Sequence, residues 1–185
     1  MRPLHLFAFG LVLVALELRV GDWDLLPGPL GWLLTLLAVH RISRRTDLQR
    51  TGLIWALGLA TVAAAALTWL PVGADWVEDA EDAVRWAVGL PAMLYSGLVC
   101  IELSRLARAD SYSTPTGLLQ WTGIGFFVSG VAPVLIIGGG QSWLEVPALA
   151  VNALAQLSLF VLCLVYGARA WAGVPVTTPP DVVSP

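Results

Sequence analysis

Lysine is absent from this chain of 185 residues, and charged side chains of either sign are scarce. All ten basic residues are arginine, and charged residues make up 12% of the sequence against 57% for hydrophobic ones. Soluble domains carry about 25% charged residues, so this composition excludes an ordinary water-soluble protein and predicts a chain that lies mostly in lipid. The arginines form no patch with interleaved aromatic side chains, so we expect no nucleic-acid partner. The lack of lysine indicates the codon bias of a high-GC bacterium.

Catalytic signatures are missing as well. The sequence contains no Gly-x-Ser-x-Gly, no His-Glu-x-x-His, no Walker phosphate loop and no pair of aspartates within an apolar stretch. These motifs carry the common hydrolase, metalloprotease and nucleotide chemistries. We therefore expect a protein that is not an enzyme and that needs no cofactor.

Cysteine and histidine occur only twice each. Cys100 and Cys163 lie inside apolar stretches, where a reduced, buried and unreactive thiol is the usual state. His5, His40 and Glu102 bring further ligand types for a transition metal, but no two of these residues have the close spacing of a ligand pair. We expect ordinary packing rather than a metal site.

Apolar stretches dominate the rest of the chain. Six of them follow one another, at residues 4–18, 30–39, 52–72, 86–103, 118–137 and 146–166. A helix needs about 20 apolar residues to cross a bilayer, so the second stretch is short and crosses only if it extends toward Arg45 or if Leu25 and Leu26 enter the membrane. Residues 75–86 have apolar and acidic side chains on opposite helical faces, which predicts a helix lying in the interface.

These patterns predict an all-α fold, an integral membrane bundle of about six transmembrane helices with a short or broken second helix and an outer interfacial helix. The bundle forms one domain over residues 1–172. The proline-rich segment 173–185 is predicted to be a disordered cytoplasmic tail.

The arginines predict the orientation. With six crossings both termini lie on one side, and eight of the ten arginines fall on that side, at positions 2, 41, 44, 45, 50, 105, 108 and 169. Arginine-rich loops stay in the cytoplasm of bacteria. The sequence therefore predicts a multi-pass protein of the bacterial cytoplasmic (inner) membrane with both termini cytoplasmic.

Small residues recur every fourth position in the third stretch. Gly52, Ala56, Ala60 and Ala64 form a ladder that would let another helix backbone approach closely. We call these four residues the packing seam. They predict a contact with another helix, either in the same chain or in a partner.

A motif near the start of the chain resembles a family. Glu17, Arg19 and the run Asp24-Leu25-Leu26-Pro27, followed by Gly31 and Trp32, resemble a group of small, uncharacterised bacterial multi-spanning proteins. In that group an acidic-x-basic end of the first helix precedes a Leu-Pro-Asp-x-x-Gly-Tyr start to the second. Here Gly28 replaces the acid and Trp32 the tyrosine. The resemblance covers about thirty residues and implies the same multi-helix architecture without an activity.

Polar residues within the apolar stretches are the candidates for function. Glu17, Arg19 and Asp24 could surround the mouth of a cavity as a proton or cation site, or they could anchor a helix end in the interface. Asn152 and Gln156 lie one helical turn apart, and Ser129 on another helix could meet them. These three could line a polar path or could hold helices together, an interaction worth about 0.6 to 2 kcal/mol.

Two functions follow from these candidates. The first is a transporter- or channel-like protein for a small solute or ion. The second is a non-catalytic membrane subunit or scaffold that packs against itself or against a membrane-protein partner. A water-accessible cavity that reaches Glu17, Asn152 or Gln156 would favour transport, whereas a closed core with a broad apolar face would favour assembly.

Overall fold

A computed structural model describes residues 2–16, 19–20, 23–24 and 28–174. The described residues form seven α-helices, which are α1 (Pro3–Ala15), α2 (Gly28–Ser43), α3 (Thr51–Trp69), α4 (Pro71–Glu78), α5 (Asp82–Ala109), α6 (Ser113–Pro133) and α7 (Glu145–Tyr166). The shorter elements are η1 (Val134–Gly138), η2 (Ser142–Leu144), η3 (Ala170–Ala172) and the strands β1 (Arg19–Val20) and β2 (Trp23–Asp24). Apart from this two-residue strand pair, the fold is helical, as predicted.

Among the described residues, four helices are long and apolar enough to cross a membrane. They are α3, α5, the run of α6 and η1, and the run of η2 and α7. The apolar helix α1 has 13 residues and is shorter than a bilayer requires, and α2 has 16. The structure thus supports a membrane-inserted bundle, while the six crossings stay a prediction.

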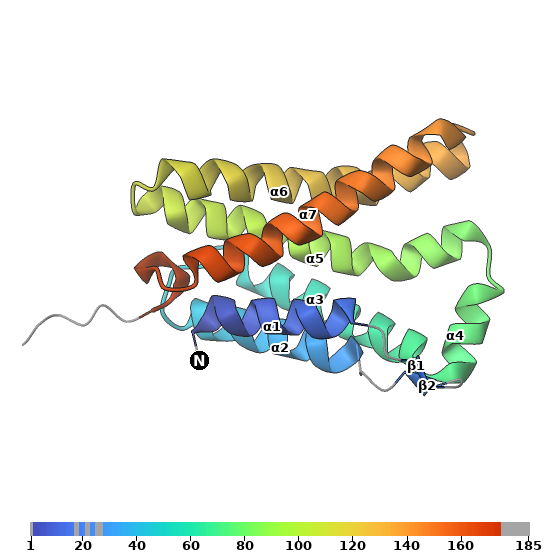
Figure 1. Ribbon diagram of the computed structural model, residues 1–185, viewed down its shortest axis with the longest axis horizontal. Coiled ribbons are helices and arrows are strands. Elements are labelled where there is room, and N and C mark those ends of the chain that lie inside the picture. The colour runs from blue at the N-terminus through green and yellow to red at the C-terminus, as the bar shows by residue number, and fades with distance from the viewer. Residues whose placement is uncertain (1, 17–18, 21–22, 25–27, 175–185) are drawn as a thin grey trace, which may run out of the picture.

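Six of the described helices pack in a closed ring. Each of α1, α2, α3, α5, α6 and α7 packs on the next, and α7 returns to α1. In Figure 1, α5, α6 and α7 form one layer and α1, α2 and α3 the other. The N-terminus, the α5–α6 turn and the end of α7 lie at one end of the bundle, which we call the arginine end, and α4 and the strand pair lie at the other (Figure 1).

Two hydrogen-bonded side chains join the layers. Tyr95 in the middle of α5 is fully buried, and its hydroxyl donates to the Thr35 hydroxyl of α2 at 3.2 Å. Thr35 in turn donates to the Trp32 carbonyl at 2.8 Å. The Phe7 and Trp32 rings lie against the Tyr95 ring, with centroids 6.3 and 6.0 Å away. This cluster fixes the positions of α1 and α2 relative to α5.

The irregular parts differ from the sequence expectations in two places. The second helix was expected to be short or broken, and α2 is short, with 16 residues, but continuous from Gly28 to Ser43, because Pro29 lies in its first turn, where a missing N–H costs nothing. The interfacial helix expected over residues 75–86 is divided, since α4 ends at Glu78 and α5 starts at Asp82. At Pro133, α6 ends and a π-helical turn, η1, follows.

The packing seam lies on the outward side of α3. Gly52, Ala56 and Ala60 are exposed, Ala64 is half-buried, and a Cβ added at Gly52 would meet nothing within 4 Å. The buried residues of α3 are Ile54, Gly58 and Thr61, which lie on a different face. Within the described chain the seam therefore faces no other helix, and its predicted contact would have to come from a second molecule.

Candidate functional site

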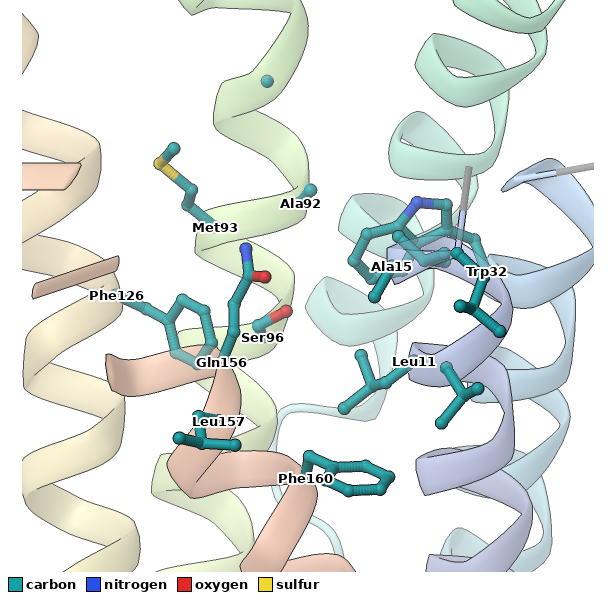
Figure 2. A pocket seen from close by; sticks show the side chains of 14 residues that line it. Leu11, Ala15, Trp32, Ala92, Met93, Ser96, Phe126, Gln156, Leu157 and Phe160 are labelled. Carbon is teal, nitrogen blue, oxygen red and sulfur yellow. The ribbon is translucent and has the colours of Figure 1, made fainter. Parts of the chain in front are cut away.

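A cavity of about 600 Å³ lies between the two layers of the bundle. It is lined by α1, by Trp32 of α2, and by residues of α5, α6 and α7. Its volume falls within the range of small-molecule pockets, about 300 to 1,000 Å³. Figure 2 shows Leu11, Ala15 and Trp32 on one wall, facing Ala92, Met93, Ser96, Phe126, Gln156, Leu157 and Phe160 on the other.

The ring of helices explains why the cavity forms here. At the arginine end, α1 and α7 are in contact: the His5 Nε2 atom of α1 lies 3.3 Å from the Leu164 carbonyl oxygen of α7. Toward the other end α7 runs away from α1 (Figure 1). The lining residues of α1 extend to its last turn, at Ala15, and those of α5 begin near its start, at Gly89. The cavity therefore lies in the half of the bundle toward the strand pair.

Two polar side chains lie within this otherwise apolar lining, Ser96 and Gln156. Ser96 of α5 is 3% exposed, and its hydroxyl makes no hydrogen bond to another described residue. The Gln156 amide of α7 extends over Ser96 in Figure 2. The serine hydroxyl and the glutamine amide can each donate and accept a hydrogen bond, so they could bind a polar atom of an otherwise apolar ligand.

Among the predicted polar residues of α6 and α7, only Gln156 lines this cavity. The Ser129 hydroxyl donates to the Gly125 carbonyl at 2.9 Å and approaches the Ala148 carbonyl of α7 at 3.5 Å. It thus joins α6 to α7, one turn before Asn152. The Asn152 Oδ1 atom is buried and has no hydrogen-bond partner among the described residues. The three residues do not form one continuous polar path.

The predicted charged residues near the start of the chain can be placed only in part. Glu17 lies outside the described residues. Arg19 and Asp24 are paired opposite each other in the antiparallel register of β1 and β2.

Ser96 was missed by the sequence analysis as a site residue. It lies in the run Tyr95-Ser96-Gly97 within a long apolar stretch, so a polar side chain among apolar ones could have marked it as a candidate site residue. Gln156, which lines the same cavity, is 60 residues away in the sequence, and only the closure of the helix ring, in which α7 packs on α6 and on α1, places both residues at one cavity. Trp32 was noted for its motif, and the structure adds that it lines the cavity.

Comparisons of the chain with protein-family models, with curated proteins and with solved structures found no match. The resemblance on Glu17 to Trp32 therefore stays a prediction. Among the described residues, no group of three or more histidine, cysteine, aspartate or glutamate side chains could hold a metal ion.

Proposed function

We propose that the protein binds a small, mainly apolar molecule in the cavity between α1, α5 and α7 and carries it across the membrane. The observation that supports this most directly is the cavity itself, which reaches Gln156 and contains the Ser96 hydroxyl. Its aromatic lining, Trp32, Phe126 and Phe160, suits a flat apolar ligand with one or two hydrogen-bonding atoms.

An ion is a weaker candidate for the transported species. The described residues that line the cavity include no charged side chain. An ion taken from water into such surroundings would lose its hydration without gaining a counter-charge. A neutral ligand would lose only a few hydrogen bonds with water, which Ser96 and Gln156 could replace.

The cellular location is part of the proposal. The arginine bias supports a bacterial cytoplasmic membrane with both termini in the cytoplasm. With this orientation the cavity would lie in the outer half of the bundle, and the ligand would enter or leave on that side. Membership of the group of small bacterial multi-spanning proteins is proposed on the Glu17 to Trp32 motif alone.

The test uses 1-naphthol, a fluorescent bicyclic molecule with one hydroxyl, as the probe. We expect the purified full chain to bind it saturably and to speed its entry into protein-containing vesicles. Gln156→Leu should weaken binding by up to about ten-fold, the effect of one hydrogen bond, and Ala92→Trp should abolish it by filling the cavity. Gln141→Leu, the same change outside the cavity, is the control.

The outcomes separate transport from a structural role. If 1-naphthol binds and moves equally with wild-type protein and Gln156→Leu, the cavity is not the path. If Gln156→Leu instead lowers thermal stability or changes the oligomeric state, Gln156 holds helices together and the transport proposal loses its main residue.

Assembly through α3 is a second candidate function. The exposed packing seam lies beside the exposed apolar side chains Leu53, Leu59 and Leu67, a face that a second helix could cover closely. Ala56→Leu with Ala60→Leu would block close approach without touching the core. A drop in molecular mass in detergent would support assembly, whereas an unchanged mass would remove the seam as an interface.

A further inference from the structure

A second hollow, of about 250 Å³, lies at the arginine end of the bundle, where α3 begins, α5 ends and α6 begins. It shares no lining residue with the apolar cavity and does not depend on transport, while its assignment to a lipid rests on the proposed membrane orientation. Polar and charged side chains dominate its lining: Gln49, Arg50, Glu102, Arg105, Arg108 and Gln120. We call it the arginine pocket.

A buried carboxylate organises the arginine pocket. The Glu102 side chain is only 2% exposed. Arg105 donates from Nε to its Oε2 atom at 3.2 Å, and the Gln49 backbone N–H donates to the same oxygen at 3.2 Å. Arg105 also donates to the backbone carbonyl of Asp47. Glu102 thereby fixes both Arg105 and the α2–α3 connection in place, as a buried carboxylate must be paired.

One carboxylate cannot balance the charge of all three arginines, although Arg50 also forms a long ion pair with Glu102. Arg50 lies 3.8 Å from Glu102 Oε1, beyond a normal hydrogen bond, and its side chain is 56% exposed. Arg108 donates to the neutral amide oxygen of Gln120 at 3.1 Å. Three guanidinium groups against one carboxylate leave a net charge of +2 (3 − 1) on the described lining. Several N–H donors of Arg50 and Arg108 are therefore left to bind an anion.

We propose that the arginine pocket binds a phosphate group. Guanidinium groups match the oxygens of phosphate in geometry and charge and can bind two of them at once. The position of the pocket favours a phosphate that belongs to an anionic lipid. Basic pockets at the cytoplasmic ends of membrane helices bind such headgroups, and the exposed Leu53 and Trp121 follow Arg50 and Gln120 along α3 and α6, where acyl chains would lie.

The experiment measures lipid binding to the purified full chain by native mass spectrometry. Phosphatidylglycerol is the anionic probe, and phosphatidylcholine is the zwitterionic one. We expect phosphatidylglycerol to bind more tightly, and Arg50→Gln and Arg108→Gln each to weaken it by about five-fold, as expected for one arginine near an anionic surface. Arg44→Gln is the matched control, since Arg44 is exposed at the same end but does not line the pocket.

A second arm identifies the source of the phosphate group. Selective phosphatidylglycerol binding that inorganic phosphate does not displace assigns the pocket to lipid. Saturable binding of inorganic phosphate that is lost in Arg50→Gln and Arg108→Gln assigns it to a soluble phosphate compound. Equal binding of both lipids with no phosphate binding would overturn the proposal, as would a loss in Arg44→Gln as large as in the pocket variants. Neither pocket variant touches the Glu102 to Arg105 pair, and unchanged melting temperatures would verify their folding.

Discussion

Gly10 and Gly31 face each other across α1 and α2 with no room for a side chain on either. A Cβ at Gly10 would lie 2.6 Å from the Gly31 carbonyl oxygen, and a Cβ at Gly31 would lie 2.7 Å from that of Gly10. The two backbones thus touch directly. This contact holds together the shortest pair of helices in the ring.

Gly10→Ala should therefore destabilise the protein. Backbone atoms cannot move aside as a side chain can, so the two helices must separate, and overpacking of this kind costs about 1–3 kcal/mol. We expect the melting temperature in detergent to fall by several degrees. The matched control is Gly52→Ala, because a Cβ there meets nothing within 4 Å. An equal fall in both variants would show that the close approach of α1 and α2 is not what Gly10 provides.

The hydrogen bond between Tyr95 and Thr35 makes an asymmetric prediction. Tyr95→Phe removes the donor and leaves Thr35 still bonded to the Trp32 carbonyl, so the cost should be about 1 kcal/mol. Thr35→Val removes the acceptor and leaves a buried tyrosine hydroxyl without a partner, which should cost about 1–3 kcal/mol. Thermal unfolding of both single variants and of the double variant measures these losses of stability.

The double variant provides the check. If the Tyr95 hydroxyl is the unsatisfied group in Thr35→Val, adding Tyr95→Phe should restore part of the stability. A double variant whose loss equals the sum of the two single losses would mean that the hydroxyls do not interact.

The helical fold and most helix positions could be predicted from the sequence, because long apolar stretches bounded by proline, glycine and charge indicate membrane helices. The stretch 146–166 became α7 (Glu145–Tyr166), and 52–72 became α3 (Thr51–Trp69) and the start of α4. With 13 and 16 residues, α1 and α2 are shorter than the about 20 residues that a bilayer crossing requires, so the number of crossings could not be predicted in the same way.

The site was predictable only in part, for a physical reason. A single polar residue in an apolar helix, such as Gln156, can be recognised from its neighbours in sequence. Which side chains it faces depends on how helices distant in sequence pack, so Ser96 and the apolar cavity could not be derived. The periodicity of the packing seam was real, yet it marks the outward face of α3, because spacing alone does not say which face is buried.

The proposed orientation predicts a difference in chemical labelling. Arg44→Cys and Glu78→Cys place single exposed thiols at opposite ends of the bundle, while the native Cys100 and Cys163 are buried. In intact bacterial cells, a membrane-impermeant maleimide should modify Glu78→Cys and should reach Arg44→Cys only after lysis. The reverse pattern would place the arginine end outside and overturn the proposed topology.

The ion pair between Glu102 and Arg105 predicts that two arginines of one pocket differ in their effect on stability. Arg105→Gln leaves Glu102 buried with the Gln49 N–H and the distant Arg50 as its remaining partners, and an underpaired buried charge is costly. Arg105 is about one-third exposed, so solvent screening reduces the loss, and we expect about 1–3 kcal/mol. Arg108→Gln should cost little, since Arg108 contacts only a neutral amide at the surface. Adding Glu102→Gln to Arg105→Gln should recover part of the stability, because it removes the unpaired charge. The melting temperatures of Arg105→Gln, Arg108→Gln and the double variant test this, and a double variant no more stable than Arg105→Gln would mean that Arg105 does not stabilise the fold through Glu102.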